Sequence, residues 1–145
     1  MYDTTTLAPA SQPAVTYNGS SNRFLVTWQR VNYELPVVYQ IQSRTTSTMG
    51  IIGTVVTLAN RTTSLTAPAA AVAGNGQFLV VWQGRRNGND DIYGQRLTAS
   101  GGLTGGNFVI ANSNSAEMAP ALVWHSSANA YLVVWQRDGN VWARP

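Results

Sequence analysis

Short apolar runs of four to six residues, separated by polar turns, recur along the whole chain. They are rich in β-branched and aromatic residues and are bounded by Gly, Asn, Ser and Pro, which is typical of β-strands. No stretch combines helix-capping residues with a sustained helical apolar period. The pattern therefore predicts an all-β fold.

One of these runs occurs three times in nearly the same form and ends each time in Trp-Gln, at spacings of 54 and 53 residues. The copies are Phe24–Gln29, Phe78–Gln83 and Tyr131–Gln136. Each follows a Pro-Ala pair by a nearly constant interval, at Pro13-Ala14, Pro68-Ala69 and Pro120-Ala121. A regular internal repeat of this length indicates that one supersecondary unit is used several times.

Each unit contains further apolar segments on either side of the Trp-Gln run. After the run come a polar turn and a short strand with an aromatic residue, at Val38-Tyr39, Ile92-Tyr93 and Val141-Trp142. A fourth segment, 54–58 and 107–110, closes the first two units. The Ala-rich strand after each Pro suits an innermost position, and the Trp-Gln run suits a strand buried on both faces. Four short strands per unit of about 50 residues predict the blade of a β-propeller, with about three four-stranded blades per chain.

The repeat resembles the Pro-Ala, Leu-Val-Val-Trp-Gln and Ile-Tyr-Gly-Gln-Arg-Leu repeats found in tandem in bacterial propeller-like proteins. The second unit matches best, through Ile92–Leu97, whereas the first replaces that segment with Val-Val-Tyr-Gln-Ile-Gln. The resemblance covers nearly the whole chain and implies a fold rather than an activity. In architecture the chain is similar to short-chain propeller lectins, although their sugar-site motif is not visible.

The unit count predicts an incomplete ring. The expected boundaries are 1–12 for an N-terminal strand that completes another blade, 13–67 for blade 1, 68–119 for blade 2 and 120–145 for a third blade without its last strand. Propellers have roughly four to eight blades. Two chains would give six, so we expect a head-to-tail homodimer in which residues 1–4 complete the partner's third blade. The alternative is that the chain is an excised part of a longer propeller.

Composition narrows the classes of partner. The net charge is +3 and the pI about 9.7, but all nine basic residues are Arg and only 10% of residues are charged. This is a weak electrostatic footprint, so no nucleic-acid partner is expected. The absence of Cys excludes disulfides and thiolate metal sites. No signal peptide or membrane span is recognised, and the localisation is left open.

Four arginines follow the repeated Trp-Gln and are expected on one rim, where their guanidinium groups could bind carboxylates, sulfates or phosphates. They are Arg30, Arg85, Arg86 and Arg137. The alternative is a solvated rim balanced by the acidic residues of the same loops, which are Glu34, Asp90, Asp91 and Asp138. The run Asn87–Asp91 could offer oxygen ligands to calcium, but a turn explains the same letters. No metal or cofactor is expected.

Aromatic residues form the second candidate site. Trp28, Trp82 and Trp135 end apolar runs and are expected in the core between blades. Tyr17, Trp124 and Trp142 are better candidates for an exposed platform that binds a ligand. His125, the only histidine, follows Trp124 on the same strand and joins this candidate site.

These features favour a non-catalytic binding or scaffold module for glycans or polar small molecules. One alternative is a glycan hydrolase that uses Glu34, Asp91 and Asp138 as its carboxylates. Another is a purely structural repeat of a larger surface protein.

Overall fold

A computed structural model describes residues 8–86 and 88–145, which form eleven β-strands and no helix. The prediction of an all-β chain is confirmed. The strands form three antiparallel sheets, in each of which neighbours in sequence are neighbours in space.

Sheet 1 contains β1 (Ala10–Asn18), β2 (Arg23–Asn32), β3 (Val38–Ser47) and β4 (Val56–Arg61). Sheet 2 contains β5 (Leu65–Val72), β6 (Phe78–Arg86), β7 (Asn89–Leu97) and β8 (Leu103–Ala111). Sheet 3 contains β9 (Glu117–His125), β10 (Ala130–Arg137) and β11 (Asn140–Arg144).

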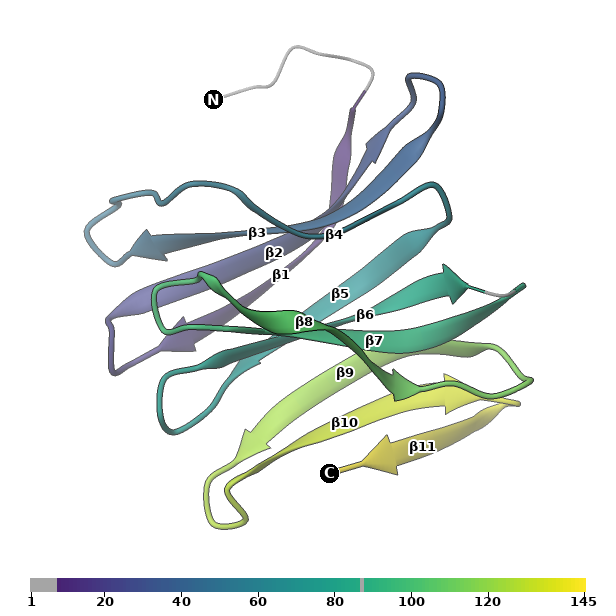
Figure 1. Cartoon of the computed structure of the whole chain (residues 1–145). Helices are drawn as coiled ribbons and strands as arrows, with labels where there is room; N and C mark the ends of the chain where they lie inside the picture. Colours follow the sequence, from purple (N-terminus) through teal and green to yellow (C-terminus); the bar gives the residue numbers. More distant parts are fainter. Residues whose placement is uncertain (1–7, 87) are drawn as a thin grey trace.

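The three sheets follow one another in a stack, with sheet 2 in the middle (Figure 1). The first strands of the sheets are neighbours, since β5 contacts both β1 and β9. These strands begin three residues before each repeated Pro, at Ala10, Leu65 and Glu117. Residues 10–12 therefore belong to sheet 1 and not to a preceding strand as expected. The strand expected at residues 1–4 lies outside the described residues.

The repeated Pro and the repeated Trp are joined by a β-bulge. In each first strand, the Pro and the residue before it stand opposite a single residue of the second strand, which is the repeated Trp. The residue before Pro has a positive φ near 50° in all three sheets, at Gln12, Ala67 and Ala119. Proline has no N–H to donate to the ladder, and a bulge is one of the few strand positions that tolerate it. This geometry explains why the two motifs keep a constant interval.

Alternation along the second strand gives each sheet two distinct faces. We call the face that carries the repeated Trp the Trp face and the opposite one the Leu face. In sheet 2 the Trp face presents Phe78, Val80 and Trp82. The Leu face of the same strand presents Leu79, Val81 and Gln83. Side chains on a strand point alternately to opposite sides, so every repeat inherits this division.

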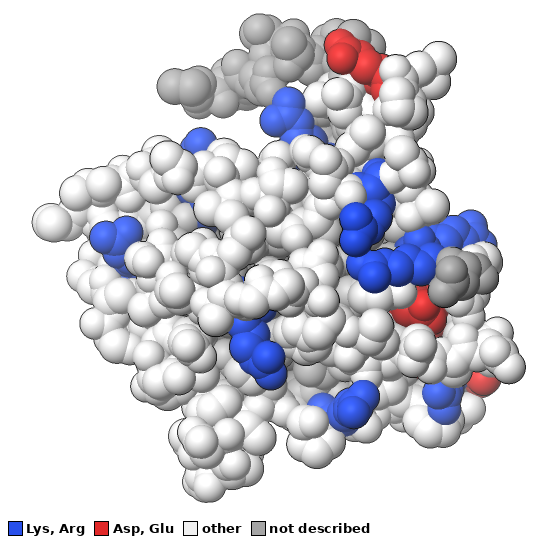
Figure 2. Space-filling model, in the orientation of Figure 1, with Lys and Arg blue, Asp and Glu red and all other residues white. Residues whose placement is uncertain are grey.

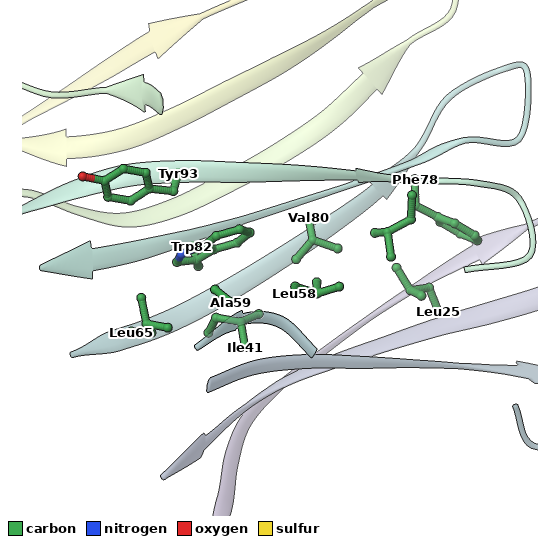
Figure 3. Close-up of a cluster of buried hydrophobic side chains, with 10 residues drawn as sticks. Leu25, Ile41, Leu58, Ala59, Leu65, Phe78, Val80, Trp82 and Tyr93 are labelled. Atoms are coloured by element: carbon green, nitrogen blue, oxygen red, sulfur yellow. The ribbon is translucent and has the colours of Figure 1, made fainter. Parts of the chain in front are cut away.

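Two apolar clusters fill the layers between the sheets. The Trp face of sheet 2 packs against the Leu face of sheet 1, with Trp82 and Phe78 meeting Leu25 and Ile41 (Figure 3). The Leu face of sheet 2 packs in turn against the Trp face of sheet 3, around Trp135. The same pair of faces thus meets at both internal interfaces.

Burial of the second strand depends on its place in the stack. Strand β6 is buried on both faces, as the sequence predicts, but β2 and β10 are buried mainly on the side that faces sheet 2. Trp82 is fully buried and Trp135 nearly so. Trp28 is only half-buried, because its face of sheet 1 is not covered by another described sheet.

Candidate functional site

The predicted site residues divide between the two ends of the strands. Tyr17, Trp124 and His125 lie where β1 and β9 end, next to the turns that lead into β2 and β10. The four arginines lie at the opposite end, where β2, β6 and β10 finish, and Trp142 in β11 is beside them. Basic side chains do gather at this end, near the connection of β6 and β7 (Figure 2). The sequence therefore points to two separate regions.

At the arginine end, Arg137 is held by two neighbours. Its Nη1 lies 3.3 Å from Oε1 of Glu117, whose side chain is 1% exposed. Its guanidinium also lies 3.4 Å from the centre of the Trp142 ring. The indole ring and the carboxylate both attract the positive charge of the guanidinium, so together they hold the Arg137 side chain in place. Arg137 and Trp142 therefore bind each other.

Arg86 repeats the ring contact one layer away. Its guanidinium lies 3.8 Å from the centre of the Tyr93 ring, and the Tyr93 hydroxyl donates a 3.0 Å hydrogen bond to Asp91. Burial, the hydrogen bond and the negative charge of Asp91 raise the pKa of Tyr93 to about 12. Arg85 is exposed and stands opposite Asp90 in the hairpin. Arg30 stands opposite Ala10 in sheet 1.

The carboxylates weighed for hydrolysis do not face a common hollow. Asp91 is buried beneath Tyr93, whereas Glu34 and Asp138 are exposed in the turns after β2 and β10. Neither of the two hollows described below has an acidic residue in its lining. Retaining glycosidases need two carboxyl groups about 5 Å apart and inverting enzymes about 6.5–9.5 Å. The described structure shows no such pair lining a hollow.

In the stretch weighed for calcium, Gly88 forms a turn and residues 89–91 are the first residues of β7. Asn87 lies outside the described residues, and Gly88 has a φ of 97°, which glycine adopts readily. The Asn89 amide donates to the backbone oxygens of Ser113 and Ser115, which fastens this turn to the loop before β9. Among residues 8–86 and 88–145, no cluster of three His, Asp or Glu side chains is arranged to hold a metal ion.

At the opposite end, His125 caps its own turn. Its Nδ1 accepts a 3.0 Å hydrogen bond from the backbone N–H of Ala128. Asn18 occupies the same repeat position in sheet 1, where it is fully buried and donates to the Gly76 oxygen at 2.7 Å. Tyr17 packs on Phe24 and remains 46% exposed. His125 is thus a turn residue with no serine or carboxylate partner among the described contacts.

Trp124 lines a hollow of about 480 Å³ between sheets 2 and 3. Its apolar wall combines aliphatic side chains with three aromatic rings, those of Phe108, Trp124 and Tyr131. The Trp124 and Tyr131 ring centres lie 4.9 Å apart in an edge-to-face arrangement. The amides of Asn75, Gln77 and Asn129 add polar groups from the two turns. This volume and this mixture of aromatic and polar groups are typical of a small-molecule site.

Two arginines give this hollow its charge. The Arg96 guanidinium lies 4.7 Å from the centre of the Phe108 ring, and Arg144 donates to the Ile110 backbone oxygen at 2.7 Å. Burial raises the pKa of the Tyr131 hydroxyl and outweighs the positive charge of Arg96, which favours the phenolate. Tyr131 donates to the Gln77 oxygen and is therefore fixed in place. Two Arg side chains in a hollow that no Asp or Glu side chain lines make it suited to an anion.

Sequence reasoning found Trp124 but missed Arg96, Arg144, Phe108 and Tyr131. Tyr131 and Arg96 belong to the repeat motifs and were assigned to the fold alone. The hollow lies where β8 of sheet 2 comes close to β11 of sheet 3. Strand patterns in the sequence do not show which strands of different sheets lie close together. Arg144 carried the useful signal. It pairs with Val133 as Gln95 pairs with Val80 at the same repeat position, so the repeat places a charged side chain where sheet 2 has a buried amide.

A second hollow, of about 310 Å³, lies on the uncovered Trp face of sheet 1. Val26, Trp28, Arg44, Thr46 and Ile52 line it. It lies on the opposite side of sheet 1 from the Leu25 and Ile41 core.

Comparisons of the chain with protein-family models, with curated proteins and with solved structures found no match. The described residues include no helix of the length and apolar character that crossing a membrane requires.

Proposed function

We propose that the chain is a non-catalytic binding module built from β-propeller blades, and that the hollow between sheets 2 and 3 binds an anionic sugar unit or a similar small carboxylate. The propeller arrangement is supported by three consecutive meander sheets whose first strands are neighbours. Stacking through the same pair of faces at both interfaces is also what successive blades require.

The observation that carries the proposed function is the combination of Arg96 and Arg144 with aromatic walls in one hollow of about 480 Å³. Aromatic rings offer apolar surface to a sugar ring, and arginine forks bind carboxylates with defined geometry. Amides of the two turns are placed to meet hydroxyl groups. The volume falls within the usual range of small-ligand sites, about 300–1,000 Å³.

The test is a titration followed by Trp fluorescence and calorimetry, with glucuronic acid, N-acetylneuraminic acid and neutral glucose as probes. We expect the acids to bind at least about tenfold more tightly than glucose, which corresponds to about 1.4 kcal/mol. Arg144→Gln should abolish this preference. Arg61→Gln is the matched control, because Arg61 is exposed at the end of β4 and does not line the hollow. This substitution removes the same charge at a different place.

Equal binding of acids and glucose, or equal losses in the two variants, would refute an anion site in this hollow. A panel of chromogenic glycosides tests the hydrolase alternative in parallel. Turnover that disappears in Asp91→Asn would replace the binding proposal with an enzymatic one.

A further inference from the structure

The two outer sheets each have one uncovered face. Among the described residues, no further sheet covers the Trp face of sheet 1 or the Leu face of sheet 3. These two faces lie at opposite ends of the stack (Figure 1). They are also the same two kinds of face that meet inside the chain, once between sheets 1 and 2 and once between sheets 2 and 3.

On the uncovered Trp face, one apolar side chain is exposed although the equivalent side chains of the other two sheets pack against a core. Val15, two residues after the repeated Pro, is 63% exposed. The residues at the same position in the other sheets, Ala70 and Leu122, pack against the two core clusters. The hollow beside Trp28 lies on this same face. The sequence thus keeps apolar side chains here although no described sheet covers them.

The uncovered Leu face shows the same contrast. Val123 is 56% exposed, whereas its counterpart Ala71 in sheet 2 is 7% exposed. Leu132 is 40% exposed, whereas its counterpart Leu79 is 4% exposed. Leu132 and Val123 are also partners across the β9–β10 ladder, so they form one continuous apolar surface.

A hydrogen bond recurs at both internal interfaces and is incomplete at the uncovered faces. The N–H of the bulge residue before Pro donates to a Gln side chain of the preceding sheet, from Ala67 to Gln12 at 2.6 Å and from Ala119 to Gln83 at 3.2 Å. The two acceptors come from different strands, since Gln12 is in β1 and Gln83 follows the repeated Trp in β6. Gln136, the counterpart of Gln83, is exposed on the Leu face of sheet 3. The third bulge residue is Gln12 itself, in sheet 1. A donor on one free face therefore matches an acceptor on the other.

We propose that the Leu face of sheet 3 docks on the Trp face of sheet 1 of a second copy of this chain. In that interface Val123 and Leu132 cover Val15 and the hollow beside Trp28, and Gln136 accepts the bulge N–H of the partner. The docking repeats the internal interfaces without a new kind of contact.

This interface joins two different surfaces, so it builds either a closed ring or an open filament. Three sheets per chain allow two copies to close a ring of six, which lies within the usual propeller range of roughly four to eight blades. The ring would use two identical interfaces and leave no apolar sheet face uncovered. We therefore assign two copies to the assembly.

The test is light scattering after size-exclusion chromatography, which should give twice the chain mass of 15.6 kDa at micromolar concentration. Val15→Asp blocks the Trp face, and Val123→Asp blocks the Leu face. Each variant should weaken association by about 100-fold or more, because a carboxylate would be buried without a partner. Met49→Asp is the control, since Met49 is 83% exposed in the turn after β3. Circular dichroism and a melting curve verify that each variant is folded.

Mixing the two blocked variants gives the decisive result. In a mixed pair one interface joins an unmodified Trp face to an unmodified Leu face, while the other interface carries both aspartates. An equimolar mixture should therefore recover an open dimer held by the unmodified interface, which neither variant can form alone. Dimers that are lost in one variant and not recovered by mixing would indicate a face that pairs with itself and would overturn the proposal. A monomeric parent chain, or a three-chain ring, would overturn it equally.

A second measurement covers the case in which an introduced aspartate unfolds the chain. The sequence has no cysteine, so Val15→Cys and Val123→Cys each introduce a single thiol. A short bismaleimide should cross-link the mixture of the two variants and neither variant by itself. Cross-linking of a single variant with itself contradicts the proposed pairing of faces.

Discussion

Sheet 2 and its two neighbours are built from the same repeat but differ in what covers them. Strand β6 of sheet 2 is buried throughout its apolar run, whereas β2 and β10 each present one face to solvent. Trp82 and Trp28 stand at the same repeat position, opposite the same Pro bulge, and only Trp82 is fully buried. The repeat therefore encodes the two faces, and position in the stack decides whether they form a core.

The largest expected effect comes from the matched pair of tryptophans. Trp82→Ala should reduce the free energy of unfolding by about 3–5 kcal/mol, because it opens a cavity between sheets 1 and 2. Trp28→Ala should cost less than about half as much, since that side chain is already partly hydrated. Both are measured by urea unfolding in a Val123→Asp background, so that association does not contribute. Equal losses would show that the outer face is as well packed as the middle one.

A smaller effect is expected where the same repeat position carries Ser43, Gly94 and Ala143. A Cβ on Gly94 would lie 2.9 Å from Phe108 and 3.0 Å from Ile110, both in the fourth strand of sheet 2. Gly94→Ala should therefore cost about 1–3 kcal/mol through overpacking. The reverse change, Ala143→Gly in exposed β11, should cost under about 1 kcal/mol. Thermal melting of the two variants checks the difference, and a neutral Gly94→Ala would mean that β8 moves away at no cost.

The sequence was sufficient for the strands but not for their environment. Alternating apolar residues and turn signals predicted the four-stranded units, because those signals are local. The positive φ of Ala67 and Ala119 could not be predicted, since alanine has no preference for that conformation. The hollow was missed because Arg96 and Arg144 come from different sheets. Half-burial of Trp28 depends on the absence of a covering sheet, which no residue of its own strand encodes.

The smallest expected effect is on the pH dependence of stability. It concerns the residue opposite the repeated Trp, which titrates only in sheet 2. Tyr93 stands opposite Trp82, whereas Gln42 and Trp142, which do not titrate, stand opposite Trp28 and Trp135. Burial and Asp91 raise the pKa of Tyr93 from 10.0 to about 12. Above pH 10 the unfolded chain loses this proton while the folded chain retains it, so unfolding becomes more favourable as the pH rises.

The contribution of Tyr93 is fully present below about pH 10 and is lost progressively up to about pH 12. The urea midpoint of the parent chain should therefore fall more steeply over this range than that of Tyr93→Phe. Tyr131, whose pKa is also raised by burial, adds to the slope in both chains. Tyr33→Phe is the control, because Tyr33 is 55% exposed and lies outside both core clusters. Parallel slopes for the parent and Tyr93→Phe would mean that the phenol ionises as readily in the folded middle sheet as in the unfolded chain, so the cover provided by sheet 1 would not extend to the Asp91 end of the strands.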